Sequence, residues 1–366
     1  MKSIPFYQPL FFNSYADRVH EQILSNQIGS GKATREFASQ LAFYVGSRYC
    51  LLTTSGTVAL SIAAYGLGLK PGDEILIPAY GVVSTINAFT TFGLKARLVD
   101  IERFSGCLSP VELKKQITAK TRAVCSVNFS GCTGSDLEEV VQICHERNLP
   151  LIEDAACALG QRFRGKNAGT FGSIGIYSFS VPKIITTGQG GALVMQSDKY
   201  FQRASRFIDQ GDINWRKTNL IRDVGSNFRF NDILAAFGLA QLKDIKKRVA
   251  RKSAVYAVIR KGLKNKIFQI PGTMPPLHYI VFTSKPLALI KYLKDRGINA
   301  VKQYRTISQH PAYAHLDDDH FPNADFWTHH AVYLPFGLAL EVKDAKRIVE
   351  ALIKSNIPLL EMGKTL

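Results

Sequence analysis

The sequence has few of the features that mark metal-binding, secreted or membrane-spanning chains. Its 366 residues include only six cysteines, with no C-x-x-C pair and no histidine at zinc-finger spacing. This pattern indicates no metal site and favours reduced thiols in a cytoplasmic protein. The stretch 1–22 contains an apolar patch, but proline and polar residues interrupt it. We therefore expect no signal peptide and no membrane insertion, and we expect this stretch to form an arm that packs on the domain or on a partner subunit.

Acidic residues are also scarce, since the sequence has 29 aspartates and glutamates against 46 lysines and arginines, which gives a net charge of +17. Such a balance suits nucleic acid, anionic surfaces or phosphorylated substrates. The densest basic stretch is 243–252, KDIKKRVARK, which at helical spacing forms either a solvated face or a surface that attracts a diphosphate-linked sugar. No recognition-helix pattern or aromatic-basic RNA motif accompanies it, so we expect no nucleic-acid partner and keep a basic regulatory protein as the weaker alternative.

Apolar strands and helices alternate through the first two thirds of the chain. Helices are predicted to begin near Thr57, Ser84, Ser109 and Ser135. Strands are predicted at 51–55, 74–78, 96–100, 122–128, 149–154, 174–180 and 190–195. This order is typical of βα units around a mostly parallel sheet, so the predicted fold class is α/β.

The pattern changes near residue 243. A basic helix is followed by a proline-containing linker at 270–282, a helix at 286–296 and a final helix at 342–355. We therefore predict a large α/β domain with an N-terminal arm at 1–242 and a smaller C-terminal α+β domain at 243–366. The length is sufficient for about two domains with a large core.

A lysine between an apolar strand and a glycine-rich turn is the leading candidate for chemistry. Lys183 lies in the run SFSVPKIITTGQGGALVM, 178–195. Partial desolvation lowers the pKa of a lysine amine enough for a Schiff base with an aldehyde such as pyridoxal phosphate. Ser178 offers a hydroxyl group to a phosphate oxygen, and the glycines let the backbone approach a ligand. Taken alone, Lys183 is more typical of a solvated loop lysine.

The strand that contains 149–152 ends in two acidic residues, Glu153 and Asp154. Ligands of open α/β sheets bind beyond the carboxyl ends of the strands. A carboxylate there can pair with the pyridine nitrogen of pyridoxal phosphate and keep it protonated, and Asp154 is the better candidate. The alternative is an Asp154 that caps a helix beginning near Ala155.

Two further segments indicate anion binding and subunit contact. Ser55, Gly56 and Thr57 precede a run with helical spacing, so the free N–H groups and hydroxyls there would hold a phosphate. Ordinary N-capping explains the same residues nearly as well. Asn227 and Arg229 precede an apolar helix, which is most simply a packing or dimer helix with a polar lead-in.

Together these segments resemble the DegT/DnrJ/StrS family of sugar aminotransferases, which are fold-type I pyridoxal phosphate enzymes. The resemblance begins near Gly31 and covers nearly the whole chain. It rests on SGTVAL, PGDEILIPAY, LVDIE, IEDAACALG, FGSIGIYSFSVPKIITTGQGG, GSNFRF, DRGI, FPNAD and YLPF. These motifs are weak singly and specific in this order. The resemblance implies a three-layer fold around the sheet and a homodimer whose subunits share each active site.

The resemblance also implies a role for each candidate residue. Lys183 would anchor the cofactor and act as general acid and base, and Asp154 would pair with the ring nitrogen. Asn227 would reach the cofactor phosphate of the neighbouring subunit. The other implied cofactor-binding residues are Ser55, Gly56, Thr57, Cys157 and Ser178. Lys183 argues against the family's sugar 3-dehydratases, in which a histidine replaces this lysine.

Some positions depart from the family pattern. Where many members stack an aromatic residue on the pyridine ring, this chain has Val82, and Tyr80 precedes it by two residues, so either side chain would cover the ring. Ser180 and Ser308 stand where many members carry histidines that face the acceptor substrate. Because these substrate-side positions differ, the resemblance implies no particular sugar.

The implied reaction is ping-pong transamination from an L-amino acid, glutamate in most of the family, to a nucleotide-linked keto sugar. This step belongs to the biosynthesis of amino sugars for surface polysaccharides or related products. Arg229 would either bind the glutamate carboxylate or form a structural salt bridge. A pyridoxal phosphate enzyme of another reaction class remains the main alternative.

Overall fold

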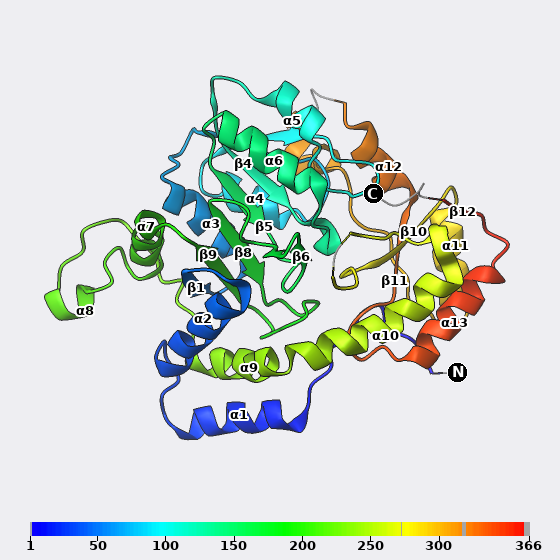
Figure 1. Cartoon of the computed structure of the whole chain (residues 1–366), viewed down its shortest axis with the longest axis horizontal. Helices are drawn as coiled ribbons and strands as arrows, with labels where there is room; N and C mark the ends of the chain where they lie inside the picture. Colours follow the sequence, from blue (N-terminus) through cyan, green and yellow to red (C-terminus); the bar gives the residue numbers. More distant parts are fainter. Residues whose placement is uncertain (1, 272, 317–319, 362–366) are drawn as a thin grey trace.

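The computed structural model describes residues 2–271, 273–316 and 320–361. These residues form one large mixed sheet, one small three-stranded sheet and a short two-stranded sheet (Figure 1). The large sheet has seven strands in the order β1-β9-β8-β5-β4-β2-β3. Only β9 runs against its neighbours, which confirms the predicted, mostly parallel sheet. Its strands are β1 Tyr49–Thr53, β2 Glu74–Pro78, β3 Lys95–Val99, β4 Thr121–Val127, β5 Leu151–Asp154, β8 Ile174–Ser178 and β9 Gly191–Met195.

Helices cover both faces of this sheet and complete three layers. The helices α3, α4 and α7 pack on one face, and α2, α5 and α6 pack on the other, with α9 against α2. Their bounds are α2 Lys32–Val45, α3 Gly56–Leu67, α4 Ser84–Thr90, α5 Pro110–Gln116, α6 Ser135–Glu146, α7 Asp198–Ile208 and α9 Asp232–Lys243.

The strands are buried on both faces because successive side chains point to opposite sides of the sheet. In β2, Ile75 and Ile77 join the cluster beneath α3 and α4, while Leu76 joins the cluster beneath α5 and α6. A continuous apolar run is therefore the expected sequence for such a strand, and it explains why these strands could be located from the sequence.

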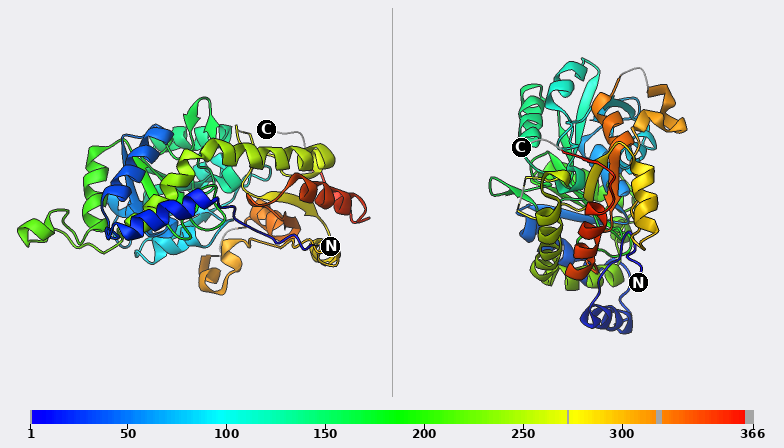
Figure 2. Two further views of the ribbon diagram at one scale, coloured as in Figure 1. Left: turned by 90° about the horizontal axis from the view of Figure 1, so that it is seen from below. Right: turned by 90° about the vertical axis from the view of Figure 1, so that its right-hand side faces the viewer.

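The small sheet has the order β11-β10-β12 and has its own apolar cluster. Helix α10 runs from the base of the large sheet to this cluster and packs against α13 (Figures 1 and 2). Because α10 contributes to both clusters, the domain division at residue 243 stays a prediction. The elements here are α10 Ile245–Leu263, β10 Tyr279–Thr283, α11 Pro286–Lys294, α12 Pro322–His330, β11 Ala331–Leu334, α13 Val342–Ile353 and β12 Leu359–Leu360.

The predicted N-terminal arm packs on its own chain. Ile4 and Tyr7 form bridges to Ile298 and Phe336 beside the small sheet, and helix α1, Asn13–Leu24, packs on α9. The remaining elements are β6 Arg162–Phe163, β7 Lys166–Asn167, α8 Trp215–Thr218 and 3₁₀ turns at Phe129–Gly131, Lys264–Lys266, Ile307–Gln309 and Pro311–Leu316. Among the described residues, no helix is both long enough and apolar enough to cross a lipid bilayer.

Candidate active site

A cavity of about 410 Å³ opens at the carboxyl ends of β4, β5 and β8. Strand register places Val127 beside Asp154 and Asp154 beside Ile176, and all three residues line the cavity. The cavity therefore lies where open α/β sheets bind their ligands. The predicted residues that line it are Ser55, Gly56, Thr57, Val82, Asp154, Cys157, Ser178, Ser180 and Lys183.

The N-terminus of α3 forms one wall of the cavity. The Ser55 hydroxyl accepts a hydrogen bond of 3.1 Å from an N–H in the first turn, so this residue does cap the helix. The first N–H groups of any helix lack intrahelical acceptors and attract an anion. A Cβ atom on Gly56 would lie only 2.9 Å from Cβ of Ser178, so glycine is what lets β8 and its hydroxyl approach this helix end. The wall therefore has the donors and the close backbone approach that a phosphate group requires.

Lys183 is half-buried and lines the cavity, so it is not the solvated loop lysine of the alternative interpretation. Its Nζ donates to Sγ of Cys157 at 3.1 Å. Two neighbouring carbonyl groups fix the loop: Tyr7 donates its hydroxyl to the Val181 carbonyl, and Arg248 Nε donates to the Ile184 carbonyl at 2.7 Å. The arm and helix α10 thereby hold the amine in place.

Asp154 presents a buried carboxylate to the same cavity. Its oxygens accept hydrogen bonds of 3.1 Å each from the Ala156 N–H and the Thr85 hydroxyl. Burial raises the pKa of Asp154, while the Ala156 N–H, the charge of Lys183 and the Thr85 hydroxyl act in the opposite direction. The following residues form turns, so the alternative in which Asp154 caps a helix beginning near Ala155 is wrong.

The neighbouring acid points to the other side of the sheet. Glu153 accepts hydrogen bonds from the N–H groups of Gly169 at 2.6 Å and Phe171 at 2.7 Å. Burial raises the pKa of Glu153 to about 7 against these donors. Glu153 thus fixes a loop, and Asp154 is the acid of the pair that can meet a ligand.

Of the predicted ring-face and substrate residues, Tyr80 and Ser308 lie away from this cavity. Tyr80 is buried, and its hydroxyl forms a hydrogen bond of 2.9 Å with the hydroxyl of Tyr333, so it does not take over the ring face. Val82 lines the cavity and is the aliphatic side chain that remains for that face. Ser308 is buried in a 3₁₀ turn outside the cavity, so its predicted substrate contact has no support here.

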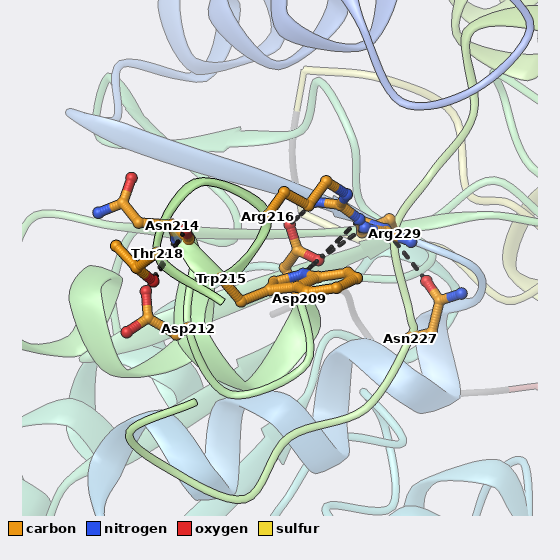
Figure 3. Close-up of polar contacts among 8 residues, drawn as sticks. All are labelled: Asp209, Asp212, Asn214, Trp215, Arg216, Thr218, Asn227 and Arg229. Carbon is orange, nitrogen blue, oxygen red and sulfur yellow. Dashed lines mark hydrogen bonds and ion pairs between the residues drawn. The ribbon is translucent and has the colours of Figure 1, made fainter. Parts of the chain in front are cut away.

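Arg229 belongs to an ion-pair cluster outside the cavity (Figure 3). Its guanidinium group donates to the Asp209 carboxylate at 2.7 Å, and its Nε donates to Oδ1 of Asn227 at 3.1 Å. Asp209 also accepts from Trp215 Nε1 at 3.0 Å and from Arg216 at 3.0 Å. Of the two predicted roles for Arg229, the structure shows the salt bridge, and the role in binding the glutamate carboxylate stays a prediction. Asn227 likewise lies outside that cavity.

The basic stretch 243–252 is only partly solvated. Lys246 and Lys247 are exposed, but Arg248 and Lys252 are buried. Arg248 binds the carbonyl groups of Ile184 and Leu10, and Nζ of Lys252 donates to the Leu277 carbonyl at 2.8 Å. Arg248 and Lys252 thus bind carbonyl groups inside the molecule, so the interpretation of this stretch as one solvated face is wrong for these two residues.

The sequence interpretation also missed several cavity residues. Thr85 binds Asp154, while Ser130, His278 and Tyr304 form the walls nearer the small sheet. The histidine and the tyrosine come from segments far along the chain and carry no local motif. Only the packing of the small sheet against the large one brings them to the cavity.

Three features of the cavity fit pyridoxal phosphate. They are the amine of Lys183, the helix end suited to phosphate, and the buried carboxylate of Asp154, which has no ion-pair partner among the described residues. On this sheet they define a fold-type I pyridoxal phosphate enzyme. The model of the DegT/DnrJ/EryC1/StrS aminotransferase family matches residues 13–353, so the chain belongs to that family. The predicted family, the aminotransferase class and the cofactor are thereby confirmed.

Named relatives agree with this membership. A GDP-perosamine synthase of Escherichia coli O157:H7 is 34% identical over 272 residues, which cover 74% of each chain. A GDP-perosamine synthase of Caulobacter vibrioides is 31% identical and covers 88% of this chain and 90% of the relative. The crystal structure of the aminotransferase TlmJ from Streptoalloteichus hindustanus superposes with a TM-score of 0.90 at 25% identity, over 96% of this chain and 98% of TlmJ.

Proposed function

We propose that the protein transfers an amino group from L-glutamate to a nucleotide-linked keto sugar. The observation that carries this proposal is the meeting of the Lys183 amine and the Asp154 carboxylate in one cavity of about 410 Å³. Relatives named for GDP-perosamine synthesis favour a GDP-linked sugar as the acceptor. The amino sugar formed would supply the biosynthesis of surface polysaccharides or related products.

Each cavity residue has a defined task in this proposal. Pyridoxal phosphate, when bound, supplies an electron sink for negative charge at the substrate carbon. The Lys183 amine holds the cofactor and later carries a proton at Nζ as general acid and base. The Asp154 carboxylate would accept a hydrogen bond from the protonated ring nitrogen. The α3 N-terminus and Ser178 would bind the phosphate. Val82 covers one ring face by aliphatic packing.

The free lysine favours amino transfer over the loss of a sugar hydroxyl group. A transaminase needs an amine that can bind the cofactor again after each half-reaction, and Nζ of Lys183 is held in place by Cys157 at 3.1 Å. In the dehydratase pattern a histidine stands at this position, where it can move a proton but forms no covalent anchor. A different reaction class on the same residues is the second candidate function.

We further propose a homodimer that completes each site. The segment 209–229, which contains α8, extends away from the body of the molecule (Figures 1 and 2). It exposes apolar side chains, among them Leu220, Ile221 and Val224. Phe43 of α2 is 90% exposed and lines a groove of about 830 Å³. Exposed apolar side chains in such number favour a protein partner. A second copy would cover it and receive Asn227 at its phosphate site.

The compartment that we propose is the cytoplasm. All six cysteines are free in the structure, and four of them are buried. Unpaired buried thiols suit a reducing compartment. Nucleotide-linked sugars, the proposed acceptors, are water-soluble substrates.

The reaction can be tested in the reverse direction. We expect the protein loaded with pyridoxal phosphate to form L-glutamate from 2-oxoglutarate when GDP-perosamine is supplied as the amino donor, with loss of the amine from the sugar nucleotide detected by mass spectrometry. Lys183→Ala should abolish both changes while the fold, checked by circular dichroism, is kept. An unchanged rate in Lys183→Ala would contradict the proposal. Glutamate formation with a dTDP-linked amino sugar alone would overturn the GDP assignment.

A further inference from the structure

His278 stands in the cavity wall just before β10, and its backbone is fixed. Its N–H donates to Oγ of Ser130 at 2.9 Å, and the preceding N–H, of Leu277, donates to the Ser130 carbonyl at 2.6 Å. The side chain is 4% exposed. The position of the imidazole is therefore set by the fold before any ligand binds.

The ring nitrogens, by contrast, have no hydrogen-bond partner among the residues that the structure describes. Nδ1 is buried, and neither nitrogen forms a hydrogen bond within the described part of the chain. The ring lies beside four other rings, with centroid distances of 4.9 Å to Phe336, 5.4 Å to Tyr333 and 6.4 Å to each of Tyr304 and Phe129. Buried polar groups are satisfied in the great majority of cases, so an unsatisfied one in a cavity wall indicates a ligand.

The surroundings keep this imidazole neutral. Burial, followed by the positive charges of Lys183 and Lys252, lowers the pKa of His278 well below its ordinary range. A neutral imidazole offers one donor and one acceptor. It lacks the positive charge that strengthens a hydrogen bond to a carboxylate. Its chemistry therefore matches a hydroxyl group, which both donates and accepts.

We propose that His278 determines specificity for the acceptor, because one of its ring nitrogens hydrogen-bonds a hydroxyl group of the bound sugar. It does not bind the carboxylates of the amino donor. This inference rests on the proposed function, since of the two proposed substrates only the sugar nucleotide brings hydroxyl groups into the cavity. The two half-reactions of a transaminase can be measured separately, so the inference has a test of its own.

The test compares three variants. His278→Phe keeps an aromatic ring among its aromatic neighbours and removes both nitrogens. His278→Asn places an amide near the position of Nδ1 and keeps hydrogen bonding. His330→Phe is the matched control, because His330 lies against Phe326 at a ring-centroid distance of 4.7 Å, with its Nδ1 3.1 Å from the Thr283 carbonyl oxygen, outside the cavity.

Two measurements are made on each variant loaded with cofactor. The first is the single-turnover rate of the absorbance change on addition of L-glutamate or of GDP-perosamine. The second is the Kd of GDP-perosamine for the pyridoxamine phosphate form, by calorimetry, where no amino group can be transferred. The Kd does not depend on catalysis and so separates binding from chemistry.

We expect His278→Phe to raise the Kd for GDP-perosamine and to lower kcat/KM for this sugar by about tenfold to hundredfold. The glutamate half-reaction should stay within about threefold of wild type, because the donor does not touch this residue. His278→Asn should recover part of the loss, and His330→Phe should behave as wild type.

Other outcomes overturn the inference. An unchanged Kd and rate for the sugar in His278→Phe would show that the ring is only packing. An equal loss in both half-reactions would show a general structural role. If His278→Phe misfolds, His278→Asn, which retains polarity, provides the second test. A wild-type protein that reacts with glutamate but not with GDP-perosamine would contradict the acceptor class and this inference together. A wild-type protein that reacts with neither would contradict the proposed function itself.

Discussion

At the scale of single residues, Lys252 is the least expected charge in the molecule. It is buried, its Nζ donates to one carbonyl group at 2.8 Å, and the rings of Tyr279 and Phe336 lie 5.7 Å and 5.9 Å away. Desolvation lowers the pKa of Lys252 to about 7 against the influence of Cys157, and Lys183 lowers it further. The residue therefore places a titratable positive charge directly behind the cavity wall that His278 forms.

This pKa predicts a pH-dependent stability. Between pH 7 and the ordinary lysine pKa of 10.5, the unfolded chain binds more protons at Lys252 than the folded chain does, so the free energy of unfolding contributed by this group rises with pH. Lys252→Met lacks the titrating amine, so its stability does not gain from this deprotonation. We expect its free energy of unfolding to fall by roughly 2 to 4 kcal/mol relative to that of wild type as pH rises through that window. Urea unfolding at pH 7 and pH 9.5 measures the difference. A constant difference between the two proteins would contradict the assigned pKa.

The site residues differ in how far the sequence could predict them. Lys183, Asp154 and Ser178 follow or end strands of the large sheet, and strand order alone brings such positions together. The side chains of His278 and Tyr304 depend on how a second sheet packs against the first, which no local pattern encodes. For the same reason the sequence could not decide between Tyr80 and Val82 as the cover of the ring face.

At the scale of elements, the start of α2 is stabilised from another helix. Asp232, the first residue of α9, is buried and accepts hydrogen bonds from the N–H groups of Gly31 at 2.8 Å and Thr34 at 2.8 Å and from the Thr34 hydroxyl at 2.6 Å. Burial acts to raise the pKa of Asp232, but these donors outweigh it and lower the pKa. The ionised side chain thus joins α2 to α9, and both helices cover one face of the large sheet.

We expect Asp232→Ala to lower the free energy of unfolding by roughly 1 to 3 kcal/mol, because the donors at the start of α2 lose their acceptor. Asp232→Asn keeps one acceptor oxygen and should lose less. Since the folded pKa is depressed, the contribution is complete above the ordinary carboxyl pKa and disappears as pH falls through the folded value. Denaturant unfolding of the three proteins at pH 7 and at pH values below the ordinary carboxyl pKa of 3.8 tests this, and a loss that stays equal as pH falls through that range would contradict the ionised cap.

The elements themselves were the most predictable level. Each predicted strand and helix of the alternating region is present, because buried parallel strands are continuous apolar runs. Two of the helices between them, α3 and α5, begin at serine caps. The ends differ by a few residues, as for the helix predicted at 342–355, which spans Val342–Ile353. Arg248 and Lys252 show the limit, since a basic run on a helix does not reveal which of its cations the next layer buries.

At the scale of the whole molecule, the projecting segment 209–229 is the part of the fold that we assign to the proposed dimer interface (Figure 1). Figure 3 shows the polar contacts around Asp209 in this segment. Ion pairs hold the two ends of this segment together, with Asp209 bound to Arg229 and Asp212 bound to Arg222 at 3.2 Å. Through Arg229 the same cluster orients the amide of Asn227. The structure therefore presents Asn227 at the base of a segment that has few contacts with its own chain.

A shared active site predicts complementation between two defective chains. Lys183→Ala and Asn227→Ala should each have low activity alone. After co-expression, mixed dimers hold one site with both native residues, so about a quarter of the wild-type sites should be restored. Activity and dimer mass are measured on the same purified sample. A mixed dimer with no gain in activity would contradict the shared site, and a monomer would contradict the dimer.

The most direct test of the central claim is the absorbance spectrum of the purified protein before and after addition of L-glutamate. We predict a visible band from pyridoxal phosphate bound covalently to Lys183, which glutamate replaces with the shorter-wavelength band of pyridoxamine phosphate. Lys183→Ala, supplied with the same cofactor, should lack the covalent band. A wild-type protein that shows no such band in the presence of pyridoxal phosphate, or whose band glutamate leaves unchanged, would contradict the assignment of an aminotransferase that uses Lys183 and glutamate.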